Sequence, residues 1–337
     1  MKRVSLLGAG SWGTALAINL AKNGHDVTLW SALESEITLL ETHREHIERL
    51  PGVKLLNNIK ICSDLAKACE NMDLIVFSVA SPYVRSTAKM CAEFIEDGQL
   101  IVNVAKGIEE STLMTLSDIL KQEIPQAEIA VLSGPSHAEE VSKGIPTTVV
   151  VGASKRSTAE YIQEIFSNNV FRVYSSPDIT GIELGGALKN VIALAAGIVD
   201  GLGFGDNTKA ALMTRGIAEM TRLGLAMGCE SETISGLSGI GDLIVTCTSN
   251  HSRNHNAGYL MGKGYSMDDA MKEVKQVVEG VYSAKAALKL AKKYEVSMPL
   301  IEKVNEVLFD GASARDAADE LFNRIKVAEY PNLKWKE

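Results

Sequence analysis

The stretch Val4-Ser5-Leu6-Leu7-Gly8-Ala9-Gly10-Ser11-Trp12-Gly13 decides the fold of this chain, because an apolar run passes directly into the glycine spacing G-x-G-x-x-G. A helical stretch over residues 14–23 follows, so the sequence predicts a strand, a tight turn and a helix. Gly8 permits the tight turn, Gly10 lets backbone approach a pyrophosphate, and Gly13 lets the helix pack on the strand. The start of that helix also supplies partial positive charge. In this position a dinucleotide-binding loop outweighs a mere glycine turn as the interpretation.

The same rhythm of short apolar runs and helical stretches continues to about residue 152. The runs are Val4–Leu7, Val27–Trp30, Leu74–Val79, Leu100–Val104, Ile129–Leu132 and Thr147–Val151. This alternation predicts a parallel sheet built from βαβ units.

After Pro177 the β-branched runs fade and long periodic segments replace them. These segments are Glu183–Val199, Lys209–Met227, Ser283–Tyr294 and Leu300–Leu308. Ser176 and Pro177 are typical of an N-cap and a first helical position, which places a domain boundary near residue 178. The sequence therefore predicts an α/β Rossmann-like dinucleotide-binding domain over residues 1–178, an all-α substrate-binding and catalytic domain over residues 179–337, and a cleft between them.

Composition restricts the partners. The net charge of −8 argues against nucleic acid or an anionic membrane, which both favour a broad basic surface. The 5 cysteines include no C-x-x-C pair, which suits a reducing cytoplasm. We expect no membrane segment, since Lys189 interrupts the longest apolar run. Lys2 and Arg3 imitate the start of a signal peptide, but cleavage after it would remove the glycine loop.

One charged residue, Lys189, stands inside the otherwise apolar segment between Glu183 and Asp200. A helix of this composition must be mostly buried. A lysine there either extends along the helix to reach water or acts as a chemical group with a lowered pKa. The surrounding glycines and alanines leave room for a ligand, which favours the second interpretation. Hydride transfer to a ketone needs a proton donor at the carbonyl oxygen, and Lys189 is the candidate.

Other polar groups follow predicted strands or interrupt the apolar second half. Lys106, in Asn103–Gly107, and the stretch Ser133–His137 lie where the carboxyl edge of the sheet would bind a ligand. Arg253, between Ser252 and Asn254, offers a planar fork that suits phosphate, although a surface salt bridge is the plainer alternative. For each of these groups a structural role stays open.

Two chemical questions have no decisive sequence signal. The second strand ends in Ser31, which is neither the acid that favours NAD nor an arginine that favours NADP, and Glu34 lies a little late, so the phosphate state of the cofactor is open. Cys247, His251 and His255 suggest a metal site by their spacing, but three ligands in a non-standard pattern favour a hydrogen-bonding loop instead, and we expect no metal.

Seven segments taken together resemble the bacterial NAD(P)-dependent glycerol-3-phosphate dehydrogenases over nearly the whole chain. They are Gly8–Gly13, Asn103–Gly107, Ser133–Ala138, Gly185–Asn190, Gly239–Asp242, Ser252–Asn254 and Val277–Gly280. The resemblance implies NAD(P)H as cofactor and reduction of dihydroxyacetone phosphate to sn-glycerol 3-phosphate, which feeds glycerophospholipid synthesis in the cytoplasm. A homodimer is the candidate oligomeric state.

The resemblance also implies residue roles. Lys189 matches the proton acceptor of the oxidation direction. Substrate binding is implied for Lys106, Gly134, Ser136, Lys189, Asp242, Ser252, Arg253 and Asn254. Besides Gly8, Gly10 and Gly13, cofactor contacts are implied for Ser11, Trp12, Lys106, Ala138, Arg253, Val277 and Glu279. The family pattern often has a basic residue just after the second strand, where this chain has Ala32 and Leu33.

Two other hypotheses are compatible with the glycine loop. One is another phosphosugar or hydroxyacid dehydrogenase of similar two-domain build, which would share the helix lysine. The other is a non-catalytic redox sensor that binds a dinucleotide, which would have no need of Lys189 in an apolar helix. Substrate profiling distinguishes the other dehydrogenase from the leading hypothesis. Consumption of NADH with dihydroxyacetone phosphate distinguishes the non-catalytic sensor from it.

Overall fold

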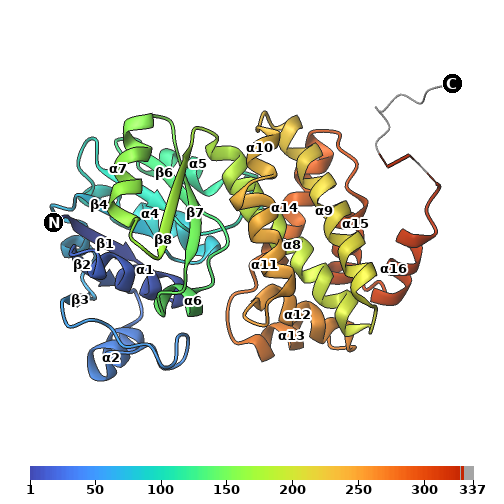
Figure 1. Ribbon diagram of the computed structural model, residues 1–337, viewed down its shortest axis with the longest axis horizontal. Helices are drawn as coiled ribbons and strands as arrows, with labels where there is room; N and C mark the ends of the chain where they lie inside the picture. The colour runs from blue at the N-terminus through green and yellow to red at the C-terminus, as the bar shows by residue number, and fades with distance from the viewer. Residues whose placement is uncertain (327, 330–337) are drawn as a thin grey trace.

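The computed structural model describes residues 1–326, 328 and 329 and shows two bodies side by side along the long axis of the molecule (Figure 1). The first body contains the β-sheet, and the second consists of helices. The predicted class, an α/β Rossmann-like domain followed by an all-α domain, is confirmed.

Eight strands form one sheet in the order β3-β2-β1-β4-β5-β6-β7-β8. They are β1 (Arg3–Leu7), β2 (Asp26–Trp30), β3 (Ile59–Cys62), β4 (Leu74–Phe77), β5 (Leu100–Asn103), β6 (Glu128–Ser133), β7 (Thr147–Ala153) and β8 (Phe171–Ser176). The prediction of a wholly parallel sheet is wrong at one pair, because β6 and β7 are antiparallel. Their connection holds only the 5-residue helix α6 (Ala138–Ser142), which is too short to return the chain along the sheet.

Sequence inspection missed β3 and β8, which are the two edge strands. Along β8 buried and exposed side chains alternate, so this strand presents no continuous apolar run. Edge strands face solvent on more sides than central ones, and their composition is correspondingly more polar.

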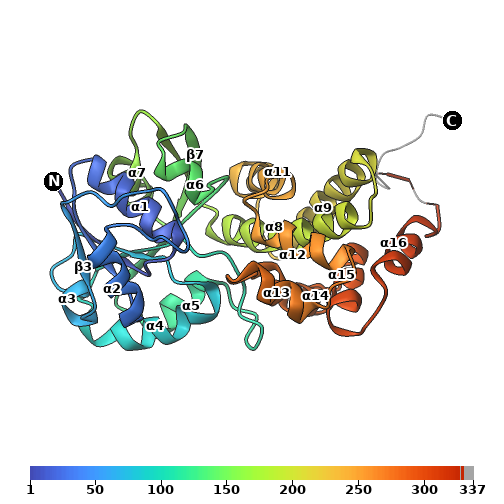
Figure 2. The ribbon, with the colours of Figure 1, turned by 90° about the horizontal axis from the view of Figure 1, so that it is seen from below.

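Helices cover both faces of the sheet (Figure 2). One face carries α1 (Ser11–Lys22), α6 and α7 (Arg156–Phe166), and the other carries α3 (Leu65–Cys69), α4 (Val84–Cys91) and α5 (Leu116–Glu123). Helix α2 (Glu34–His43) follows β2, and the short helices η1 (Ser81–Tyr83) and η2 (Ala92–Phe94) flank α4.

The glycine loop has the geometry that its spacing predicts. Gly8 has φ +120°, which favours glycine. A Cβ on Gly13 would stand 2.0 Å from the Gly8 carbonyl oxygen, so only glycine lets α1 approach the end of β1. Gly10 precedes α1 as its N-cap residue. The first turn of α1 therefore opens at the carboxyl edge of the sheet.

Helix α8 (Ile179–Gly201) is the central element of the second body. Against it pack α9 (Asp206–Ala226), α10 (Ser231–Ile234), η3 (Leu237–Gly241), α11 (Asp242–Thr248), α12 (Arg253–Gly262), α14 (Glu279–Lys293) and α15 (Pro299–Phe309). Helix α13 (Met267–Val274) packs on α12, and α16 (Ala314–Phe322) packs on α15 and α12. The predicted N-cap Ser176 is wrong. Asp178 caps α8 instead, since its Oδ1 accepts from the Gly181 N–H at 2.8 Å, while Ser176 Oγ accepts from the Asp178 N–H.

Glycines let α8 and α12 pack backbone to backbone. A Cβ on Gly197 would lie 2.0 Å from the His255 carbonyl oxygen, and one on Gly258 would lie 2.0 Å from that of Leu194. Helix α8 is long and apolar enough to cross a membrane by length and composition, but its apolar window is entirely buried inside the protein. It is the core around which the second body is organised.

Candidate active site

Lys189 lies at the middle of α8 with 6% of its surface exposed. Its Nζ donates to Asp242 Oδ1 at 3.0 Å and to Thr246 Oγ1 at 2.7 Å. The side chain therefore does not extend to water, which was the plainer of the two sequence interpretations. Burial lowers the pKa of the Lys189 ammonium to about 8, and the Asp242 carboxylate opposes that shift.

Asp242, the first residue of α11, binds a second lysine. Its Oδ2 accepts from Lys106 Nζ at 2.6 Å, and its side chain is only 2% exposed. Burial alone would raise the pKa of this carboxyl, but the Lys106 and Lys189 ammonium groups outweigh burial and hold the pKa below its ordinary value. One carboxylate thus joins a cation of the sheet domain to a cation of the helical domain.

Lys106 also orders the loop after β6. Its Nζ donates to the Gly134 carbonyl oxygen at 3.0 Å, and Ser136 Oγ donates to the same oxygen at 2.9 Å. Gly134 has φ +138°, and a Cβ there would stand 3.0 Å from Val149 Cα. The structure therefore brings together five of the residues expected to bind substrate, which are Lys106, Gly134, Ser136, Lys189 and Asp242.

The remaining expected substrate residues lie at the start of α12. Ser252 is the N-cap, and its Oγ accepts from the His255 N–H at 3.1 Å. Asn254 is buried: its Nδ2 donates to Asn190 Oδ1 at 2.9 Å and its Oδ1 accepts from the Gly280 N–H at 2.8 Å. The Asn254 side chain therefore joins α12 to α8 and α14. A ligand would bind the backbone N–H of Asn254, which lies in the first turn of α12.

Arg253 is the first residue of α12 and is exposed. Among the described residues it has no ion-pair partner within 4.0 Å, so the surface salt bridge considered for it is absent there. The first backbone N–H groups of a helix have no partner inside the helix. The arrangement of a free guanidinium beside such a helix start suits an anion with several oxygens.

The residues expected to hold a dinucleotide come from both domains. Ser11 and Trp12 open α1, and Ala138 opens α6, which packs against α1. Val277 precedes α14, and Glu279 is the first residue of that helix. The Glu279 carboxylate accepts hydrogen bonds from the N–H and the Oγ of Ser81. Burial raises the pKa of Glu279 even though these bonds and the Arg253 charge act the other way.

The glycine loop fits a dinucleotide by its shape. A Cβ added to Gly10 would meet only the far end of the Arg49 side chain, at 3.6 Å, so no backbone closes over the loop. Lys106, Ala138, Arg253, Val277 and Glu279 do not contact the loop directly through any hydrogen bond of the described chain.

Two residues of this arrangement, Thr246 and Ser81, were not predicted from the sequence. Thr246 was not selected although it lies four positions after Asp242, a spacing that places both on one face of a helix. Ser81 carried no signal, because its partner Glu279 is far away in the chain. No local pattern reports such a contact.

Cys247 and His255, two of the residues whose spacing suggested a metal site, have other surroundings in the structure. Burial raises the pKa of the Cys247 thiol to about 12, so this side chain is not a thiolate. His255 Nε2 lies 2.8 Å from Asp200 Oδ2. Over residues 1–326, 328 and 329 no group of three side chains of these types is arranged around a common point.

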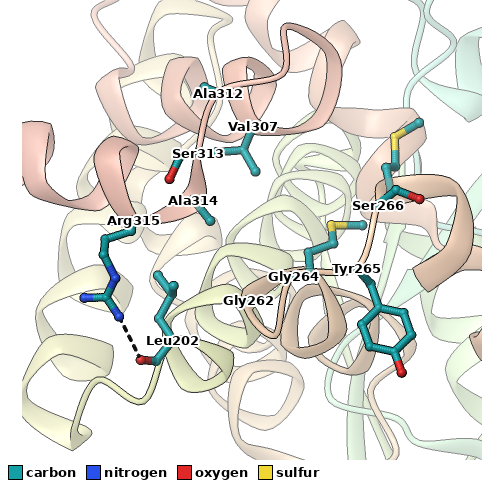
Figure 3. A pocket seen from close by; sticks show the side chains of 12 residues that line it. Leu202, Gly262, Gly264, Tyr265, Ser266, Val307, Ala312, Ser313, Ala314 and Arg315 are labelled. Atoms are coloured by element: carbon teal, nitrogen blue, oxygen red, sulfur yellow. Dashed lines mark hydrogen bonds between the residues drawn. The ribbon is translucent and has the colours of Figure 1, made fainter.

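Two hollows in the described part of the chain are large enough to consider as ligand sites. One of about 490 Å³ lies between the domains beside Ser81 and is also lined by Ile108 and Tyr282. The other, of about 350 Å³, lies between the α12–α13 connection and the start of α16 (Figure 3), where Arg315 donates to the Leu202 carbonyl oxygen at 3.4 Å. No expected site residue lines the second hollow, so it has no part in the chemistry around Lys189.

Comparison with known proteins gives a consistent result. Residues 3–159 match the model of the NAD-dependent glycerol-3-phosphate dehydrogenase N-terminus, and residues 178–319 match that of its C-terminus. The chain is 60% identical, over 100% of both chains, to a protein of Agathobacter rectalis named glycerol-3-phosphate dehydrogenase (NAD(P)+). It is 55% identical to the Fusobacterium nucleatum protein of the same name, over 98% of this chain and 99% of that protein.

Solved structures extend the comparison. A glycerol-3-phosphate dehydrogenase of Coxiella burnetii is similar with a TM-score of 0.93 and 35% identity, over 96% of this chain and 99% of that chain. A ketopantoate reductase of Ralstonia eutropha JMP134 reaches a TM-score of 0.62 at 16% identity, over 95% of this chain and 100% of that chain. The second similarity shows the two-domain fold alone.

The titration of Lys189 tests the charge arrangement directly. In the native protein we expect one lysine to lose its proton near pH 8, because burial destabilises its ammonium form. In Asp242→Asn this titration should move to lower pH, since the carboxylate that favours the charged form is gone. Lysine side-chain NMR over a pH series measures both, with Lys189→Met to assign the signal. A Lys189 signal that titrates with the exposed lysines would contradict the assignment.

Proposed function

The chain belongs to the NAD-dependent glycerol-3-phosphate dehydrogenases, and on that premise we propose that it reduces dihydroxyacetone phosphate to sn-glycerol 3-phosphate with NADH or NADPH, at the cluster of Lys189, Asp242 and Lys106. The observation that carries the proposal is a buried ammonium on α8, held by a carboxylate that also binds Lys106 of the sheet domain. The identity of 60% over the full length disfavours the two rivals, another phosphosugar or hydroxyacid dehydrogenase and a non-catalytic sensor.

The glycine loop would hold the pyrophosphate of NADH or NADPH, and the reduced nicotinamide would supply the hydride for the substrate carbonyl carbon. The carbonyl oxygen then gains negative charge, and Lys189 is assigned to donate the proton that it needs. With a pKa of about 8, Lys189 is mostly protonated at neutral pH, and it becomes the neutral base of the reverse reaction as the pH rises through that value. Thr246 and Asp242 hold the Nζ in place, and Lys106 adds a second positive charge near the oxygen.

Substrate recognition is assigned to the start of α12. Arg253 with the backbone N–H groups of α12 would bind the phosphate, and Ser252 fixes the helix start by capping it. Lys106, Gly134 and Ser136 would bind the other end of the substrate, together with Asp242. Glu279 and Val277 would contact the cofactor from the helical domain, as would Ala138 and Trp12 from the sheet domain.

The domain bounds, the cellular location and the oligomeric state are also part of the proposal. The domains would span residues 1–178 and 179–337, which is supported by the end of β8 at Ser176 and the start of α8 at Ile179. A cytoplasmic location is supported by cysteines that are all free. We also propose a homodimer. Light scattering of the purified chain should give about twice the mass of one chain, and a monomer mass at micromolar concentration would exclude the dimer.

Replacement of Lys189 tests the central assignment. Lys189→Met should lower turnover of dihydroxyacetone phosphate by about 10²-fold or more, because a positioned acid–base group contributes on that scale. Oxidation of NADH or NADPH, followed by absorbance, measures it. Lys263→Met, an exposed lysine on the same domain, is the control and should keep its activity. Cofactor binding should survive in both variants. Near-normal turnover in Lys189→Met would remove the assignment.

Removal of the Arg253 fork tests phosphate recognition. Arg253→Ala should heavily impair the reduction of dihydroxyacetone phosphate, in kcat as well as KM, because phosphate binding aligns the distant carbonyl. It should hardly change the feeble rate on unphosphorylated dihydroxyacetone. Arg253→Lys keeps the charge but loses the fork, and should also be impaired.

The matched control for this experiment is Arg315→Ala. Arg315 also lies in the first turn of a helix of the same domain, α16, but away from Lys189. It should leave both rates unchanged. An equal loss on both substrates in Arg253→Ala would show that Arg253 acts through the fold or the cofactor.

A further inference from the structure

We propose that Arg49 binds the 2′-phosphate that distinguishes NADPH from NADH, and that Glu36 holds Arg49 in position for it. The inference rests on the proposed use of the glycine loop for a dinucleotide. It concerns the adenosine end of that cofactor, where the residues directly after β2 bring no cation: Ala32 and Leu33 are uncharged and exposed.

Arg49 lies beside the glycine loop although it comes from the chain between α2 and β3. Its Nη1 is 3.6 Å from the point where a Cβ would stand on Gly10. The same Nη1 lies 2.9 Å from Glu36 Oε1, and the Arg49 side chain is 38% exposed. The guanidinium therefore has one edge bound to protein, while its other N–H groups remain available to a ligand on the loop.

Glu36 links this guanidinium to the end of β2. Its Oε2 accepts from Ser31 Oγ at 2.5 Å, and its Oε1 lies 3.2 Å from His46 Nε2. Only 7% of Glu36 is exposed. Burial alone would raise the pKa of Glu36, but its bonds to His46 and Ser31 and the Arg49 charge hold it below the ordinary value. The residue is a buried carboxylate with its oxygens engaged.

These bonds decide between the two cofactor chemistries. An NAD site presents a free carboxylate at the end of the second strand for the ribose 2′-hydroxyl. Here Glu36 on α2, which reaches the strand end through its bond to Ser31, is satisfied by Ser31, His46 and Arg49, so it has little capacity left for a hydroxyl. Of the Glu36–Arg49 pair the exposed member is the guanidinium, and an arginine near the strand end accommodates a 2′-phosphate.

The loop that carries Arg49 is fixed by its own contacts. The N–H groups of Arg49 and Leu50 donate to the His46 carbonyl oxygen at 3.2 and 2.8 Å, which closes a turn. Leu50 is 1% exposed and belongs to the core that includes α1. Arg49 is thus placed before any ligand arrives, and little side-chain entropy is left to lose on binding.

Calorimetry with two nucleotides tests the proposal. The probes are 2′,5′-ADP and 5′-AMP, which differ only by the 2′-phosphate. We expect the wild-type protein to bind 2′,5′-ADP more tightly than 5′-AMP. Arg49→Ala should weaken the binding of 2′,5′-ADP by about tenfold to a hundredfold, which is the scale of a hydrogen bond to a charged group. It should change the affinity for 5′-AMP by less than about twofold.

Two further variants control this measurement. Lys54→Ala removes an exposed cation from the same connecting segment, one that binds Glu45, and should leave both affinities unchanged. The double variant Arg49→Ala with Glu36→Gln removes both charges and so leaves no unpaired buried carboxylate that could unfold the protein. It should lose 2′,5′-ADP affinity as Arg49→Ala does.

Three results overturn the proposal. The first is equal affinity of the wild-type protein for both nucleotides. The second is an equal loss of affinity for both nucleotides in Arg49→Ala, which would place Arg49 on the shared part of the cofactor. The third is an unchanged affinity of Arg49→Ala for 2′,5′-ADP. No dihydroxyacetone phosphate is present in this experiment. A failure here therefore leaves the proposed reduction intact, and a failure of that reduction leaves the nucleotide affinities readable.

Discussion

The carboxylate of Asp242 is the interaction on which the remaining arrangement depends, because it holds two cations from different domains at one point. Without it Lys189 and Lys106 would repel each other, and each ammonium would lose its compensation for burial. Removing one member of such a buried group typically costs about 3–5 kcal/mol. Because two lysines share one carboxylate, the cluster keeps a net positive charge, which suits an oxygen that becomes negative during reduction.

Two further carboxylates of the helical domain fix the position of that domain against the sheet. Glu183 on α8 accepts from the N–H and Oγ of Ser117, at 2.9 and 2.5 Å, at the start of α5. Glu279 on α14 accepts from Ser81 in η1. Each acid meets the N-terminal end of a helix, where partial positive charge stabilises it. Together with Asp242, which binds Lys106, these acids give three points at which a buried or partly buried carboxylate joins the two domains.

The sequence predicts best those features that are local. The glycine loop, the central strands and the isolated Lys189 all leave short patterns, and the structure has each of them. It predicts poorly what depends on partners far away in the chain, such as the bond of Ser81 to Glu279 or the approach of Arg49 to Gly10. The edge strands β3 and β8 and the antiparallel direction of β7 were not predicted for a related reason. Solvent exposure and connection geometry, rather than apolar runs, determine them.

The overall negative charge and the capture of an anionic substrate are compatible because they act over different distances. Charges farther apart than about 8 Å are largely screened at physiological salt, so the net charge of −8 contributes little inside the cleft. The acids nearest the site are turned inward: Asp242 and Glu279 are engaged by Lys106, Lys189 and Ser81. Arg253, by contrast, is exposed. An approaching phosphate thus meets the Arg253 guanidinium first, while the nearby carboxylates are held in bonds to other groups of the protein.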